Sequence, residues 1–423
     1  MPSIRKSLLQ FVFSGAYMKR WNDKLRPVEL MEVDKQAHKM IVAWLLLQLN
    51  TRGMPAEERL RLGAEVVEGG LFDYFYRLVI TDIKPPVFYR IKENEAHYSE
   101  LTEWVAEELE HIVRPLDEDF WQRLLTYIRR REKNTLADRI LTAAHLYASG
   151  WEFNLIKPLN TFDDEMPDID GSFQTRLTAM ADLAGVPELI GGSSNALGRF
   201  ANLCGQLRFQ KRWSQTPRIP ETSVIGHMFI VACYAYFFSI AVGACPARRL
   251  NNFFCGLFHD LPEVLTRDII SPVKRSVKQL PELIRQYEEQ EMQERVFSLL
   301  DKAGYGDVAS RLGYFLGLAT GSEFDETVRE PAPDGAPAGT AAVVRKVTFD
   351  ELQSSCNIDA LDPKDGRLVK ACDTLAAFIE AHTSVRNGVT SSHLQEAIAR
   401  LRGEYRRVTL GPLHVGALFA DFD

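Results

Sequence analysis

The chain has 423 residues, enough for two domains that each bury a sizeable core. Hydrophobic residues make up 46% and charged residues 25%, which is the composition of an ordinary soluble globular protein. The net charge of −7 argues against a general binder of nucleic acid polymers or anionic membranes, but it permits a nucleotide, whose phosphates need only a local basic pocket.

Helical patterns follow one another along the chain, so the predicted fold class is all-α. Apolar residues recur at three- and four-residue spacing in several segments. In the first half these segments are Leu8–Trp21, Lys35–Leu49, Glu100–Val113 and Phe120–Arg131. The alternation typical of strands is scarce, and Val343–Thr348 is one short exception.

The segment Met228–Cys245 is almost wholly apolar and, at 18 residues, long enough to cross a membrane. We interpret it instead as the central helix of an all-α core, because such a helix is apolar on every side. No secretory signal is recognised at the N-terminus, and the six cysteines include no C-x-x-C pair. A cytoplasmic protein without a membrane partner is therefore expected.

An internal repeat divides the chain. Residues 70–87 (GLFDYFYRLVITDIKPPV) lie over residues 256–273 (GLFHDLPEVLTRDIISPV) without a gap. The other matched pairs are Lys19-Arg20-Trp21 with Lys211-Arg212-Trp213, His38 with His227, and Ala137-Asp138 with Cys372-Asp373. The repeat predicts two helical bundles in tandem.

The predicted boundaries follow from the repeat and from turn-rich segments. Residues 1–150 form the first domain and residues 151–194 a linker, within which 160–171 is acidic. Asn195 is expected to cap the first helix, Ala196–Arg212, of a second domain covering 195–402. That domain contains an inserted loop near 323–347, rich in Pro, Ala and Gly, and residues 403–423 form a C-terminal tail.

The adjacent His259 and Asp260 lie inside an apolar segment, where an isolated carboxylate would cost several kcal/mol to bury. A divalent cation would neutralise it, and imidazole and carboxylate are ligands that such metals accept. Adjacent side chains on a helix diverge by ~100°, so both can reach one ion only near a helix end or bend. Pro262 suits such a break.

The order His, His-Asp, Asp along hydrophobic segments resembles the HD-domain metal-dependent phosphohydrolases. It is most similar to their 5′-deoxynucleotidase branch. Lys211-Arg212-Trp213 precedes the first histidine, Glu263 completes His-Asp-x-x-Glu, and residues 266–274 (TRDIISPVK) continue the pattern. The resemblance implies one divalent metal ion (Mn, Co, Mg, Zn or Fe) held by His227, His259, Asp260 and Asp373.

The resemblance also assigns roles around the metal. Glu263, four residues after His259 and so on the same side of a helical turn, is the candidate general acid and base. Arg212 would bind phosphate oxygens, Trp213 would line the substrate pocket, and Lys274 is a further candidate for phosphate contact. Asp268 is either catalytic or structural, because its counterpart Asp82 survives in the first copy.

The first copy is expected to have lost the chemistry. Asp73-Tyr74 stands where the second copy has His259-Asp260, and Arg77 replaces Glu263. An arginine repels a metal and cannot act as a base. The first domain is therefore interpreted as a scaffold or regulatory pseudoenzyme, forming an internal pseudo-dimer with the second copy unless the chain is a homodimer like the compact family members.

The expected function is hydrolysis of a small phosphate ester, foremost a nucleoside 5′-monophosphate. The alternative enzyme keeps the same fold and hydrolyses a nucleoside triphosphate, an alarmone or a cyclic nucleotide. A non-catalytic nucleotide-sensing or scaffold protein is the other alternative, and the complete ligand set of the second copy counts against it. The expected partner is a small nucleotide, with no nucleic acid polymer.

Overall fold

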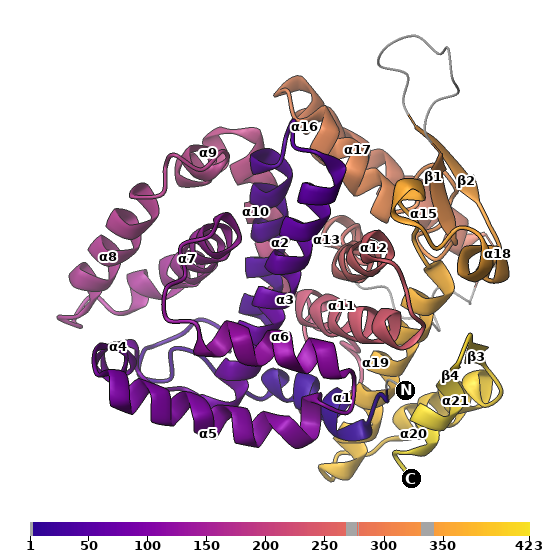
Figure 1. Cartoon of the computed structure of the whole chain (residues 1–423), viewed down its shortest axis with the longest axis horizontal. Coiled ribbons are helices and arrows are strands. Elements are labelled where there is room, and N and C mark those ends of the chain that lie inside the picture. Colours follow the sequence, from indigo (N-terminus) through magenta and orange to yellow (C-terminus); the bar gives the residue numbers. More distant parts are fainter. Residues whose placement is uncertain (1–2, 268–276, 278, 331–341) are drawn as a thin grey trace. The chain divides into compact units, whose positions relative to one another are not determined.

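The protein is described here by a computed structural model that covers residues 3–267, 277, 279–330 and 342–423. Its contacts divide the chain into two compact units, Met1–Ile190 and Gly191–Asp423. Helices dominate each unit, and the strands form only short two-stranded pairs (Figure 1). The predicted all-α class is confirmed.

The first unit is a helical bundle in which α2 packs against α3 and α7, while α5 and α6 pack on α3. Its α-helices are α1 (Lys6–Phe13), α2 (Glu32–Asn50), α3 (Ala56–Ile80), α4 (Pro85–Glu93), α5 (Glu95–Val113), α6 (Glu118–Arg129), α7 (Leu136–Ile156), α8 (Met166–Thr178) and α9 (Val186–Gly191). Short 3-10 turns cover Ser14–Ala16 and Lys157–Leu159. The helix expected over Leu8–Trp21 is thus shorter, since the chain turns before Trp21.

The boundary between the units, after Ile190, falls inside the segment 151–194 that was expected to separate the domains, but near its end. Helix α7 runs through residue 150, where the first domain was expected to end. Residues 151–190, expected as a linker, fold with the first unit because Phe153 and Met166 share a buried cluster on which Phe173 packs. Asn195 caps the second unit's first helix as predicted, with its side-chain oxygen accepting a hydrogen bond from Gly198 N.

The second unit is built around α11, which packs against α12 and α19. Its α-helices are α10 (Ala196–Gln206), α11 (Val224–Ala241), α12 (Pro246–Phe258), α13 (Glu263–Thr266), α15 (Leu280–Met292), α16 (Ser298–Lys302), α17 (Gly306–Phe315), α18 (Phe349–Ser354), α19 (Gly366–Arg386), α20 (Ser392–Tyr405) and α21 (Val415–Ala420). A π-helical turn covers Gln293–Phe297, and 3-10 turns cover Gly192–Ser194, Leu207–Phe209 and Asp359–Leu361.

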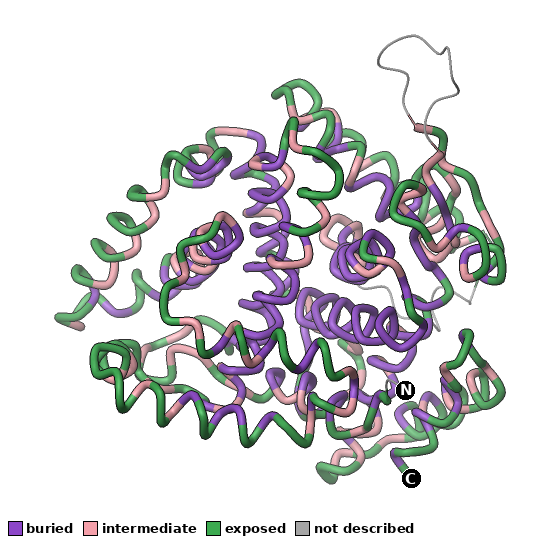
Figure 2. The backbone as a smooth tube through the Cα atoms, viewed as in Figure 1, coloured by how far each residue is buried: buried purple, intermediate pink, exposed green. Residues whose placement is uncertain are grey.

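Helix α11 is the apolar segment that could be mistaken for a membrane span. By length and composition it qualifies, but 94% of its 18-residue window is buried inside the protein. Figure 2 shows it buried along its whole length. Gly256 of α12 lets the two helices approach closely, because a Cβ atom there would lie 2.9 Å from the backbone of Ala232. This contact brings the end of α12 close to α11.

The start of α19 is fixed by buried polar contacts. Asp365 caps the helix, and its carboxylate pairs with Arg248 of α12 at 2.5 Å, with both side chains fully buried. Next to it, strand β1 (Thr327–Glu330) pairs antiparallel with β2 (Val343–Lys346), as the pattern of Val343–Thr348 predicts. Residues 331–341 of the expected insertion lie outside the described residues.

The expected C-terminal tail is also folded. Residues 403–423 complete α20 and form β3 (Thr409–Leu410), β4 (Leu413–His414) and α21. Helix α21 packs on α19 and α20, and Phe419 lies against Phe378 of α19 with ring centroids 4.9 Å apart. The tail therefore supports the back of the helix that carries Asp373.

Candidate metal centre

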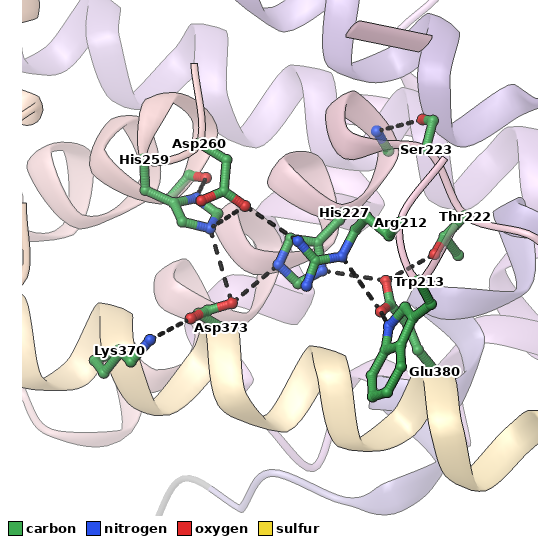
Figure 3. Close-up of polar contacts among 12 residues, drawn as sticks. Arg212, Trp213, Thr222, Ser223, His227, His259, Asp260, Lys370, Asp373 and Glu380 are labelled. Carbon is green, nitrogen blue, oxygen red and sulfur yellow. Dashed lines mark hydrogen bonds and ion pairs between the residues drawn. The ribbon is translucent and has the colours of Figure 1, made fainter. Parts of the chain in front are cut away.

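Three side chains from distant parts of the second unit converge: His227, His259 and Asp373 (Figure 3). Asp373 Oδ1 lies 3.0 Å from His227 Nε2 and 3.9 Å from His259 Nε2. One nitrogen or oxygen from each residue lies within 4.8 Å of the others. Among the residues that the structure describes, this is the one group of His, Cys, Asp or Glu with that spacing.

The three ligand positions follow from where the helices begin and end. His227 lies in the first turn of α11, whose N-terminus is capped by the Ser223 hydroxyl. His259 directly follows the last residue of α12, and Asp373 lies on the inner side of α19. Since α11 packs against both other helices, the three side chains meet where these helices touch.

The fourth predicted ligand, Asp260, lies beside this group and outside it. Its Oδ2 atom is 3.2 Å from His259 Nε2 and 3.2 Å from Arg212 Nη1. Helix α12 ends at Phe258 and α13 begins at Glu263, so the predicted interruption near Pro262 is confirmed. The break lets two adjacent side chains turn toward one point, which a regular helix would prevent.

Both histidines are oriented as metal ligands. His259 Nδ1 lies 2.8 Å from the Gly256 carbonyl oxygen, and His227 Nδ1 lies 3.2 Å from the Glu380 carboxylate. If these contacts are N–H donations, each Nε2 atom faces the centre with its lone pair. Among the described residues, no well-directed hydrogen bond reaches the buried His259 Nε2 atom. The nearest charged atom to His259 Nε2 is instead Asp260 Oδ2, at 3.2 Å, and an imidazole nitrogen beside carboxylates fits a divalent metal ion.

The charges of the centre are tightly coupled. Burial alone would lower the pKa of His259, but the carboxylates of Asp260 and Asp373 outweigh it and raise the pKa to about 9. Burial opposes ionisation of Asp373, yet Lys370 and His227 hold the pKa of that carboxyl well below its usual value. Without metal, His259 is thus protonated at neutral pH and neutralises part of the carboxylate charge.

This coupling predicts that metal binding releases a proton. A metal ion must displace the proton from His259 whenever the pH lies below about 9. The apparent association constant should therefore rise by about tenfold per pH unit below that value and level off above it. Calorimetric titration at pH 7 in buffers of different ionisation enthalpy measures the released proton. Binding without proton release would contradict the assignment of His259 as a ligand.

Glu380, which the sequence reasoning missed, organises the residues behind the ligands. Fully buried in α19, it accepts hydrogen bonds from Trp213 Nε1 at 2.8 Å and from the Thr222 hydroxyl at 2.9 Å. Its carboxylate also lies 3.4 Å from Arg212 Nε and 3.2 Å from His227 Nδ1. Burial opposes ionisation of this carboxyl, but Arg212 and His227 hold its pKa well below the usual value.

Replacing Glu380 by Gln should weaken metal binding without removing it. The carboxylate that orients His227 would become a neutral amide, and loss of such a partner typically lowers metal affinity by about 10- to 100-fold. Metal titration measures the loss. The matched control is Glu152→Gln, because Glu152 accepts the same kind of hydrogen bonds from Arg20 and Trp21 in the first unit. Equal losses in the two variants would contradict the specific role of Glu380.

The structure gives less support to the roles predicted for the remaining site residues. Glu263 is buried and begins α13, but the helix interruption separates it from His259, so the argument from a shared helical turn fails. Asp268 and Lys274 lie outside the described residues. Arg212 and Trp213 both lie behind the ligands through their contacts with Glu380, and Arg212 also reaches Asp260 (Figure 3).

Two groups near the ligands were not predicted. Lys370, one helical turn before Asp373, donates to its Oδ2 atom at 2.8 Å, and the Lys370 ammonium lies 4.5 Å from the centre of the Phe324 ring. Phe324, from the expected insertion, also packs near the His259 ring at 6.1 Å. Lys370 and Asp373 are three residues apart on one helix, and this spacing of opposite charges could have indicated an ion pair from the sequence. The position of Phe324 was not readable from the sequence.

The first unit repeats the backbone geometry that precedes the second unit's site. Lys19 forms an isolated antiparallel β-bridge with Met31, the residue before α2. Lys211 forms the same kind of bridge with Ser223, the residue before α11. Trp21 and Trp213 both adopt a positive φ, 56° and 57°, which is uncommon for a bulky residue. In both units the Arg-Trp pair then donates to a buried glutamate, Glu152 in one and Glu380 in the other.

An alignment of the two units on these shared contacts differs from the sequence matches at two positions. Lys35 is the fourth residue of α2 as His227 is of α11, so this alignment would pair Lys35, in place of His38, with His227. His145 precedes Glu152 by seven residues, as Asp373 precedes Glu380, so it would pair His145, in place of Asp138, with Asp373. His38 packs against Trp151, and Asp138 forms a capping box with Thr135 at the start of α7.

Fold and site together define an all-α protein whose second unit carries a buried His/Asp centre suited to one divalent metal ion. Residues 204–402, slightly less than half of the chain, match the family model described as HD domain. HD domains are typically metal-dependent phosphohydrolases, and the match supports this general class of enzyme. No curated protein and no solved structure matches the chain.

Proposed function

We propose that the second unit hydrolyses a nucleoside 5′-monophosphate with the help of one divalent metal ion. The observation that carries the proposal is the convergence of His227, His259 and Asp373, inside the segment that matches the HD domain, with the His259 Nε2 atom facing the carboxylates of Asp260 and Asp373. The resemblance of residues 211–213 and 259–274 to the 5′-deoxynucleotidase branch supports the choice of substrate.

His227, His259 and Asp373 would hold the ion, with Asp260 beside them as the fourth candidate ligand. When bound, the ion supplies positive charge to the phosphoryl group and lowers the pKa of a water molecule. The fit rests on ligand chemistry: imidazole nitrogens and carboxylate oxygens suit Mn, Co, Fe, Zn and Mg to different degrees.

Two cations flank the acidic side chains and would bind the phosphate oxygens. Arg212 Nη1 contacts Asp260, and Lys370 Nζ contacts Asp373 (Figure 3). Both side chains retain some exposure, 13% for Arg212 and 48% for Lys370. The two cations and one divalent ion exceed the charge of the Asp260 and Asp373 carboxylates by two, which matches a monophosphate dianion, whereas a triphosphate would need further basic groups.

The proton transfer is assigned to Glu263. In the proposed step a water oxygen forms a bond to phosphorus while the bond from phosphorus to the nucleoside O5′ atom breaks. The Glu263 carboxylate accepts the proton from the water and delivers it to the departing oxygen, which leaves inorganic phosphate and a nucleoside. Trp213, partly exposed and held by its hydrogen bond to Glu380, offers an aromatic face to the base or sugar.

The first unit is proposed to be a degenerate copy of the same bundle, serving as a scaffold or regulatory part. Three features support this proposal: the similar loops before α2 and α11, the positive φ of both Trp21 and Trp213, and the hydrogen bond that each of these tryptophans donates to a buried glutamate. The cap residues Thr81 and Arg267 also share a positive φ, 58° and 67°, at aligned positions after the matched helices.

A phosphate-release assay tests the proposed substrate class. Metal-stripped protein is supplied with Mn, Co, Mg or Zn and a panel of nucleoside mono-, di- and triphosphates, an alarmone and a cyclic nucleotide. Metal-dependent release of phosphate from the monophosphates is expected. Turnover confined to another member of the panel would replace the monophosphate, and metal binding without any turnover would favour a nucleotide sensor.

A further inference from the structure

The interior of the first unit contains an unusual concentration of buried charge. Lys35 and Lys39 are 3% and 1% exposed, and Glu32 and Glu152 are fully buried. The Lys35 ammonium lies 3.8 Å from Glu32, and the Lys39 ammonium lies 2.7 Å from Asp73. Buried charges are costly unless they are paired, so such a concentration of them in one core needs a structural or functional reason.

We infer that the first unit carries the counterpart of the metal centre with a built-in cation, the ammonium group of Lys35, in place of a divalent metal ion. The inference rests on the proposed repeat and extends it from lost ligands to a replacement charge. The inference uses the alignment of the two units on their shared loop contacts and on their buried glutamates. In this alignment Lys35 takes the position of His227, and His145 takes the position of Asp373.

The formal charges at the four matched positions support this replacement. In the second unit His227, His259, Asp260 and Asp373 carry two carboxylates and no permanent cation, which a divalent ion balances. Their counterparts in the first unit are Lys35, Asp73, Tyr74 and His145. There one ammonium balances one carboxylate, and the set is neutral without any ion.

The local electrostatics oppose an additional cation. Burial lowers the pKa of Lys35 to about 7, against the pull of Glu32, and the nearby Arg20 and Lys39 lower it further. The charge of Lys35, followed by burial, holds the pKa of His145 well below its usual value. With a pKa of about 7, Lys35 is only partly protonated at neutral pH, and the cations that lower its pKa would repel a divalent ion more strongly still.

One of the four ligand positions has been lost as well. Helix α3 runs without interruption through Asp73 and Tyr74 to Ile80, whereas the matched segment of the second unit breaks after Phe258. The Tyr74 hydroxyl donates to the Val12 carbonyl oxygen at 2.6 Å, so Tyr74 points away. Asp73 remains a carboxylate, which now accepts from Lys39 and from the Tyr127 hydroxyl.

Metal counting on the full chain tests the inference without any need for turnover. Wild-type protein should bind one ion per chain, and Asp373→Ala, which removes a ligand of the second unit, should bind none when dialysed against Mn or Zn and analysed by mass spectrometry. An ion retained by Asp373→Ala but lost on further substitution of Asp73 by Ala would overturn the inference.

A variant designed to gain metal binding in the first unit tests directly which residues of the two units correspond. In the Asp373→Ala background, Lys35→His together with His145→Asp removes the built-in cation and leaves a histidine and two carboxylates, including Asp73. This variant should gain about one ion per chain. The matched control, His145→Asp alone, should gain none because Lys35 would pair with the new carboxylate.

Equal metal binding by the double variant and its control would overturn the inference, as would no gain in a double variant whose circular dichroism is unchanged. If wild-type protein bound no metal at all, the proposed function of the second unit would fail, while the comparison of the double variant with its control would still decide the inference.

Discussion

Asp373→Ala is expected to abolish both metal binding and phosphate release. Asp373 Oδ1 lies within reach of both histidines, and its loss leaves two imidazoles and the Arg212-paired Asp260 to hold an ion. Because the ion supplies most of the charge stabilisation, phosphate release should fall by more than about a thousandfold. Metal analysis and an assay at a fixed, saturating metal concentration measure the two losses.

The matched control for this variant is His145→Ala in the first unit. His145 stands at the same position relative to the buried glutamate, but in a unit without the converging ligand group among its described residues. The control should keep the metal content and turnover of the wild type. Wild-type turnover by Asp373→Ala would contradict the assignment of the centre.

Glu263→Gln is expected to keep the metal and lose most of the turnover. The substitution preserves the size of a buried side chain at the start of α13 but removes the group that accepts and returns a proton. The loss of a general acid and base typically costs about 10² to 10⁴ in rate. The metal content should stay at the wild-type value, and KM should change less than kcat.

A second variant separates chemistry from folding in this test. Glu263→Asp keeps an ionisable carboxyl on a shorter side chain and should recover part of the rate, which a purely structural role would not predict. If Glu263→Gln turned over at the wild-type rate, the proton transfer would have to be assigned to another residue.

The features of the second unit that depend on local chemistry could be predicted from the sequence. Asn195 is a typical helix cap, and Pro262 marks the break that lets His259 and Asp260 face one point. The apolar run around α11 was correctly interpreted as a core helix, because burial on all sides requires apolar residues on all sides. Each of these signals lies within a few residues of the feature that it predicts.

Features that depend on register between distant segments could not be predicted. Helix α2 is buried on almost every side, so nothing in its periodicity distinguishes the position of Lys35 from that of His38. The shared histidine type favours His38 as the match of His227, whereas the contacts of the preceding loop and of Glu152 favour Lys35. Glu380 was missed for a related reason, since its partners Arg212 and Trp213 lie far away in the sequence.

The continuity of α3 is the main difference between the two units at the aligned segment. In the second unit Pro262 follows the His-Asp pair, whereas the matched residue of the first unit is Tyr76, which allows the helix to continue. An unbroken helix directs Tyr74 away toward Val12, so a carboxylate there would no longer reach the centre.

The most direct test of the central claim is a metal titration of metal-stripped wild-type protein, followed by the rate of phosphate release from a nucleoside 5′-monophosphate. We predict that the rate rises in proportion to the bound metal and reaches its plateau at one ion per chain. Turnover in the fully stripped protein, or no turnover of any monophosphate with one ion bound, would contradict the claim that the second unit is a metal-dependent nucleotidase.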